Sequence, residues 1–187
     1  ALRQVANWSA QGLRLPVAVN IPTRSLLDVT FPKIVQSMLT TVGVAADLLR
    51  LEVTESGVMT NPHRSIRVLN GLRALGVHLS IDDYGTGYTS MTYLRDLPVD
   101  ELKIDRSFVT HMDDDAVSAT LATAIVQLGH NLGMSVVAEG VESAVVGEAL
   151  RGAGCDGAQG FYYARPMPAE AMTRWVTSHD LPVRTPA

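Results

Sequence analysis

The sequence predicts an α/β fold of the TIM-type (β/α)8 barrel class, with about six of the eight strands present. Short apolar runs alternate along the chain with segments of helical periodicity. The runs are apolar without clear alternation, which is typical of a parallel sheet covered on its outer face. A complete barrel needs about 250 residues, and this chain has 187. A doubly wound open sheet is the competing fold, but no glycine-rich phosphate loop follows the first expected strand.

The apolar runs locate the strands, and the periodic segments between them locate the helices. Strands are expected at 15–20, 48–53, 77–81, 101–104, 135–138 and 158–162. Helices are expected at about 1–11, 32–42, 62–75, 116–132, 142–151 and 169–176. Gly76 suits the left-handed residue that ends the third of these helices. The helix at 116–132 carries one apolar stripe of Leu121, Ile125, Leu128 and Leu132.

The ends of the chain suggest how it is divided. The chain begins at Ala1, already inside an amphipathic helical pattern and without a capping residue before it. We therefore expect an N-terminally truncated barrel whose first two units lie upstream. The expected division is a partial domain at 1–178 and a C-terminal tail at 179–187.

Composition excludes several classes of protein. Hydrophobic residues make up 47% and charged residues 18% of the chain, which fits a globular domain with a sizeable core. The net charge of −4 argues against binding of a DNA or RNA polymer over a broad basic face. A small nucleotide is still compatible with this charge, because a metal ion can supply local positive charge. Cys155 is the single cysteine, so a cytoplasmic location is expected, free or as the cytoplasmic part of a membrane-anchored protein.

Polar residues fall at or near the ends of the expected strands. In a barrel these ends converge on one face, where the chemistry is done. Carboxylate and amide oxygens are hard ligands that suit Mg²⁺ or Mn²⁺ better than zinc. The residues concerned, in strand order, are Asn20, Glu52, Asp82, Asp83, Lys103, Glu139 and Gln159.

The adjacent acids Asp82 and Asp83 are the most informative of these residues. Two neighbouring carboxylates repel each other unless a cation or a proton neutralises them. A carboxylate shared by two metal ions would give a two-metal hydrolase site, which suits phosphodiester cleavage. The alternative interpretation is structural, because an Asp pair before glycine often forms a turn and Lys103 alone would more often be a solvated side chain.

Six short motifs, in order along the chain, resemble the EAL domain, a bacterial cyclic di-GMP phosphodiesterase family. Together they cover most of the chain, and their combination is far more specific than any one of them. The motifs are Val17-Ala18-Val19-Asn20, Leu51-Glu52-Val53-Thr54-Glu55-Ser56, Ile81-Asp82-Asp83-Tyr84-Gly85-Thr86-Gly87-Tyr88, Leu102-Lys103-Ile104-Asp105, Val137-Ala138-Glu139-Gly140-Val141-Glu142, and Gln159-Gly160-Phe161 with Arg165-Pro166.

The resemblance implies hydrolysis of cyclic di-GMP to linear pGpG with two Mg²⁺ or Mn²⁺ ions. It implies four metal ligands, with Asp82 shared between the ions: Asn20, Glu52, Asp82 and Asp83. Lys103 resembles the lysine that positions water, and Glu139 resembles the proposed general base or second-metal ligand. Gln159 resembles the glutamine that contacts substrate or a water on the metal. Glu55 resembles the glutamate that steadies the loop at 83–90.

The sequence also departs from the family pattern. Pro22 stands where the family usually has a serine, and proline removes a donor from this loop. The Glu-Ala-Leu segment that names the family, with its metal-ligating glutamate, is expected upstream of Ala1. The isolated chain is therefore expected to show weak or no activity.

The expected partners follow from the same resemblance. They are cyclic di-GMP, a second copy of the chain in a homodimer, and fused sensory or GGDEF domains in a longer protein. Two other functions stay open: a degenerate EAL domain that binds cyclic di-GMP as a non-catalytic receptor or interaction module, and a metal-dependent barrel that acts on another substrate.

Overall fold

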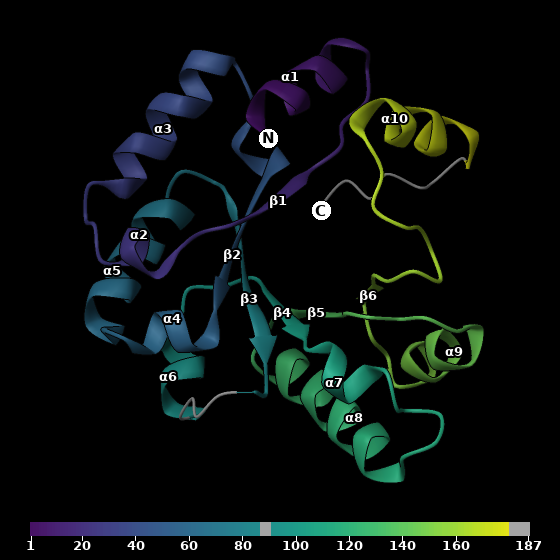
Figure 1. The fold of residues 1–187 in the computed structure, drawn as a ribbon. Helices are drawn as coiled ribbons and strands as arrows, with labels where there is room; N and C mark the ends of the chain where they lie inside the picture. The colour runs from purple at the N-terminus through teal and green to yellow at the C-terminus, as the bar shows by residue number, and fades with distance from the viewer. Residues whose placement is uncertain (87–90, 180–187) are drawn as a thin grey trace.

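A curled parallel sheet organises the chain (Figure 1). The computed structural model describes residues 1–86 and 91–179, and in these residues each strand is hydrogen-bonded to the strand that follows it in sequence. The six described strands are β1 (Val17–Asn20), β2 (Leu49–Thr54), β3 (His78–Tyr84), β4 (Glu101–Ile104), β5 (Ser135–Ala138) and β6 (Gly157–Ala158). This sequential order in a curled sheet is that of a partial barrel, so the expected fold class is confirmed.

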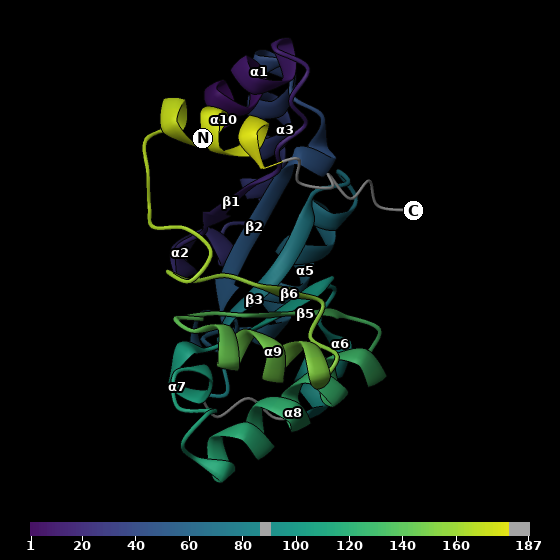
Figure 2. The same cartoon turned by 90° about the vertical axis from the view of Figure 1, so that its right-hand side faces the viewer.

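Helices precede, connect and follow the strands (Figure 1). They are α1 (Leu2–Ala10), α2 (Thr23–Leu26), α3 (Phe31–Val42), the 3₁₀ helix η1 (Ala46–Leu48), α4 (Glu55–Met59), α5 (Pro62–Arg73), α6 (Met91–Asp96), α7 (Arg106–Val109), α8 (Ala116–Asn131), α9 (Ala144–Gly152) and α10 (Ala169–Ser178). Figure 2 shows α1 and α10 side by side, and Trp8 Nε1 of α1 donates to Thr173 Oγ1 of α10 at 2.8 Å. Among the described residues, we find no helix with the length and apolarity to cross a membrane.

Most expected elements are present, and three details were wrong. The third strand does not end before Asp82; it continues through both aspartates to Tyr84. The sixth strand covers only Gly157–Ala158, because the chain turns at 161–163. In the expected stripe of α8, Ile125, Leu128 and Leu132 pack against the core, but Leu121 is 43% exposed, and the buried positions of the helix are Ala122, Val126 and Gly129. The tail expected at 179–187 lies outside the described residues except for His179.

The two faces of the sheet differ in chemistry because side chains alternate along each strand. Apolar side chains of β2, β3 and β4 pack against the helices and are almost fully buried: Leu51, Val53, Leu79, Ile81, Leu102 and Ile104. The alternate residues of the same strands are polar. Arg50 and His78 are partly exposed, whereas the others are buried: Glu52, Ser80, Asp82, Glu101 and Lys103. The inside of the curl is therefore lined with charged groups that need partners.

At the amino-terminal end of the strands, three of these polar side chains form one network: Arg50, His78 and Glu101. Arg50 Nη1 of β2 contacts Glu101 Oε2 of β4 at 3.0 Å, and His78 Nε2 of β3 lies 3.7 Å from the same oxygen. Burial would raise the pKa of Glu101, but the neighbouring His78 and the charge of Arg50 outweigh it and hold this pKa below 4.5. The network joins three adjacent strands at the end of the sheet away from their carboxyl ends.

The last described turn is held by a close backbone contact. Val141 N donates to Gln159 O at 3.1 Å, and Tyr162 N donates to Val141 O at 3.0 Å. Gly160 lies between these two bonds, where a Cβ atom would overlap the backbone of Val141. Only a glycine fits here, and the contact holds Gln159 next to the loop after β5.

We predict that E101Q destabilises the protein in a pH-dependent way. Because the pKa of Glu101 is lower in the folded state, its charge adds stability above pH 4.5, and this contribution disappears as the pH falls through the folded-state pKa. Urea denaturation should show the wild type more stable than E101Q by about 1–3 kcal/mol at pH 7, with the difference shrinking below about pH 4.5. A difference that stays constant down to pH 3 would contradict this account.

We also predict that G160A destabilises the protein by about 1–3 kcal/mol, because the new methyl group would overlap the backbone of Val141. G152A is the matched control: Gly152 ends α9, and no atom lies within 4 Å of the position that its Cβ would take, so the stability should change by less than about 1 kcal/mol. Chemical denaturation measures both. Equal stability of the two variants would show that the Gly160 contact is not needed.

Candidate metal-dependent active site

A buried lysine lies at the centre of the carboxyl-terminal ends of the strands. Lys103 Nζ of β4 contacts Glu52 Oε1 of β2 and Asp82 Oδ1 of β3, each at 2.8 Å. It also contacts Glu139 Oε1 at 2.5 Å, from the loop that follows β5. The Lys103 side chain is only 5% exposed. Three acids far apart in the sequence are thus brought together by one ammonium group.

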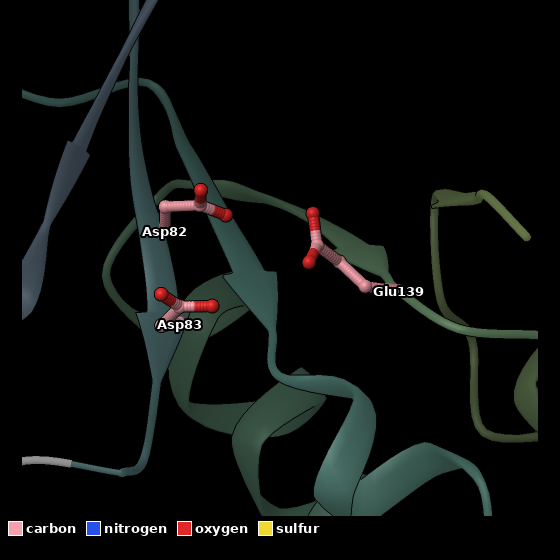
Figure 3. Close-up of side chains that lie close together, drawn as sticks. All are labelled: Asp82, Asp83 and Glu139. Atoms are coloured by element: carbon pink, nitrogen blue, oxygen red, sulfur yellow. The ribbon is translucent and has the colours of Figure 1, made fainter. Parts of the chain in front are cut away.

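A bulge in β3 explains how both aspartates reach this place. Ile81 pairs with Leu102 and Tyr84 pairs with Ile104, so two residues of β3 lie opposite Lys103 alone. Asp83 has a φ of 55°, in the left-handed region that residues other than glycine rarely adopt. Such a bulge interrupts the strict alternation of side chains. Figure 3 shows the carboxylates of Asp82, Asp83 and Glu139 gathered in one region.

The cluster holds more negative than positive charge. Burial disfavours the charged form of Lys103, but its hydrogen bonds to Asp82, Glu139 and Glu52 outweigh burial and raise its pKa. Burial raises the pKa of Glu139, and the nearby charges of Asp82 and Glu52 act in the same direction. One ammonium does not neutralise all these carboxylates, so the site favours a further cation or a proton.

Asp83 has a second acidic neighbour that the sequence analysis missed. Burial raises the pKa of Asp83, and the charges of Asp82 and Asp105 raise it further. Asp105, directly after β4, keeps a lowered pKa despite its burial, because Ser107 donates to it from both its backbone N–H and its hydroxyl. The position of Asp105 immediately after an expected strand was the sequence feature that could have identified it as a candidate site residue.

The donor set fits a hard divalent cation. Asp82, Asp83 and Glu139 each offer a carboxylate oxygen, and these oxygens lie within 4.8 Å of one another. Oxygen-only donors suit Mg²⁺ or Mn²⁺. A metal ion would relieve the mutual repulsion of these carboxylates.

The remaining predicted residues lie around this centre. Gln159 Nε2 donates to Glu139 Oε1 at 2.6 Å. Asn20 ends β1 in register with Glu52, which places both on the same face of the sheet, and Asn20 is exposed. Glu55 is buried and accepts a hydrogen bond from Gly85 N at 3.2 Å, at the start of the loop that it was expected to steady. The roles assigned to these residues stay predictions.

A cavity of about 760 Å³ opens beside the acids. Glu139 and Gln159 form part of its wall, together with the basic residues Arg106 and Arg165. The guanidinium of Arg165 lies 4.7 Å from the centre of the Phe161 ring. The space thus combines positive charge with an exposed aromatic surface, next to the candidate metal ligands.

The tripeptide Glu148-Ala149-Leu150 does occur in the chain, but it does not take part in this site. It lies within α9, not on a strand. The Glu148 side chain is 68% exposed and pairs with Arg151 one turn further on. Its match to the name of the EAL family is therefore fortuitous.

Comparison with known proteins places the chain in a family. A family model described as the EAL domain matches residues 1–166. The signaling protein YkoW of Bacillus subtilis is 39% identical over 94% of this chain, which is 22% of the length of YkoW. The chain thus spans less than a quarter of that relative.

Solved structures agree with the family match. The PaMucR phosphodiesterase, solved as a c-di-GMP complex, is similar with a TM-score of 0.88 and 41% identity, covering 92% of this chain and 70% of that one. The EAL domain of Mycobacterium smegmatis DcpA gives a TM-score of 0.92 and 32% identity, covering 97% of this chain and 82% of that one. With its sequence matched over most of its length and its curled sheet shared with these structures, the chain belongs to the EAL domain family.

Proposed function

We propose that this domain hydrolyses cyclic di-GMP to linear pGpG at a site that holds two Mg²⁺ or Mn²⁺ ions. The observation that carries the proposal is the convergence of Glu52, Asp82 and Glu139 around Lys103, with Asp83 beside them. A similar protein, PaMucR, is named as a phosphodiesterase and was solved with c-di-GMP. Family membership and an acid cluster at the expected place thus support the same reaction.

Glu52, Asp82 and Asp83 would hold the ions through their carboxylates, and Asn20 would add an amide oxygen. When bound, the ions supply Lewis-acid stabilisation of the phosphate and lower the pKa of a water molecule. Burial around the acids strengthens their attraction to a cation, because charges interact more strongly at low dielectric. The bulge at Asp82 and Asp83 lets one strand provide two ligands.

The remaining polar groups would orient the reacting partners. Glu139 lies beside the cavity, in contact with Lys103 and Gln159, and would act as the general base. Gln159 fixes the orientation of the Glu139 carboxylate by donating to one of its oxygens. Lys103 would position the attacking water and offset phosphate charge. The nucleotide would extend into the cavity beside Glu139, where Arg106 and Arg165 favour an anion.

We also propose the setting in which the domain works. It would be a domain at 1–178 within a longer protein, since it spans 22% of the length of YkoW, and sensory or GGDEF domains would be joined to it. It would act in the cytoplasm as a homodimer. Glu55 would steady the loop after β3 by accepting the hydrogen bond from Gly85 N.

The test measures pGpG formation from cyclic di-GMP with Mn²⁺, in the full-length gene product and in the 187-residue chain. The full-length protein should produce pGpG, and chelation of the metal should stop it. E52Q and D82N should each lower the rate more than about 100-fold, since even residues that only support metal ligands commonly contribute about 10- to 100-fold.

E148Q is the matched control, because it removes an exposed glutamate of the Glu-Ala-Leu tripeptide in α9 and should leave the rate unchanged. Tight binding of cyclic di-GMP without turnover would show that the domain is a non-catalytic receptor and not an enzyme. Absence of both binding and turnover would point to another substrate.

A further inference from the structure

Lys103 contacts Asp82 and Glu139, two of the three acids whose oxygens lie close enough together for a metal ion, and it also contacts Glu52. Its ammonium contacts one oxygen each of Glu52, Asp82 and Glu139, at 2.5–2.8 Å. Each of these carboxylates has a second oxygen that Lys103 does not use in these contacts. The lysine can therefore draw the three acids together and still leave an oxygen of each for a cation.

The burial of the cluster makes such a counter-charge necessary. The side chains of Glu52, Asp82 and Glu139 are 10%, 13% and 17% exposed. Carboxylates this close and this buried repel each other strongly without a positive charge among them. The acids come from β2, β3 and the loop after β5, so their repulsion would act directly on the packing of the sheet.

We infer that Lys103 is an internal counter-ion that assembles the metal-binding acids in advance and shares their negative charge with the metal. The inference rests on the proposed metal site and adds a role for Lys103 besides positioning water. Because the ammonium and the divalent ion neutralise the same acids, each contributes less to stability when the other is present. Linkage makes this coupling reciprocal, so we expect the metal to add more stability when Lys103, which neutralises the same acids, has been removed.

The experiment is thermal unfolding of the wild type and K103M, each with EDTA and with saturating Mn²⁺. Methionine keeps much of the length and volume of lysine but carries no charge. In EDTA, K103M should lose about 10 °C in Tm, the size expected when one partner of a buried ion pair is removed. Mn²⁺ should raise the Tm of K103M about twice as much as that of the wild type.

R50M is the matched control, because it removes the Arg50–Glu101 ion pair at the other end of the same strands. Its loss in Tm should be equal with EDTA and with Mn²⁺. A K103M variant that behaves like R50M, losing the same Tm in both conditions, would reduce Lys103 to a packing role and overturn the inference. The inference would also be overturned if K103M had the same Tm as the wild type in EDTA.

A second variant covers the case in which K103M does not fold in EDTA. K103M/E52Q removes one of the acids that Lys103 neutralises, so the double variant should be more stable in EDTA than K103M alone. A double variant that is no more stable contradicts the inference. If Mn²⁺ fails to stabilise the wild type, the proposed metal site is wrong, whereas the comparison of K103M with K103M/E52Q in EDTA still tests the counter-ion role.

Discussion

The structure depends on one interaction, the contact of the Lys103 ammonium with three carboxylates inside the curl of the sheet. The outer face of the strands packs apolar side chains against helices, as in many barrels. The inner face is polar, and its charges must be satisfied by one another. Lys103 meets this need by linking β2, β3, β4 and the loop after β5, so the same ion pairs support the fold and shape the site.

The site also requires a local departure from regular strand geometry. A regular strand directs adjacent side chains to opposite faces, yet Asp82 and Asp83 offer oxygens to one small region. The bulge opposite Lys103 and the left-handed backbone of Asp83 make this possible. Backbone strain of this kind costs roughly 1–3 kcal/mol and is found at functional sites, which fits the role proposed for these residues.

The sequence allowed the architecture to be predicted, because apolar runs and helical periodicity report burial directly. Parallel strands end on one side, so Glu52, Lys103 and Glu139 could be expected to meet. The bulge could not be predicted, since the pairing of Tyr84 with Ile104 is a tertiary contact. The last strand was expected at 158–162, but the backbone contact of Gly160 with Val141 leads into a turn instead.

The most direct test of the central claim is to locate Mn²⁺ by its anomalous X-ray scattering in crystals of this domain. The account predicts an anomalous peak within about 2.5 Å of an Asp82 carboxylate oxygen, with further oxygen ligands from Glu52, Asp83 or Glu139 and with Lys103 alongside. A Mn²⁺ position remote from these acids, or crystals in which Mn²⁺ occupies no site near Lys103, would contradict it.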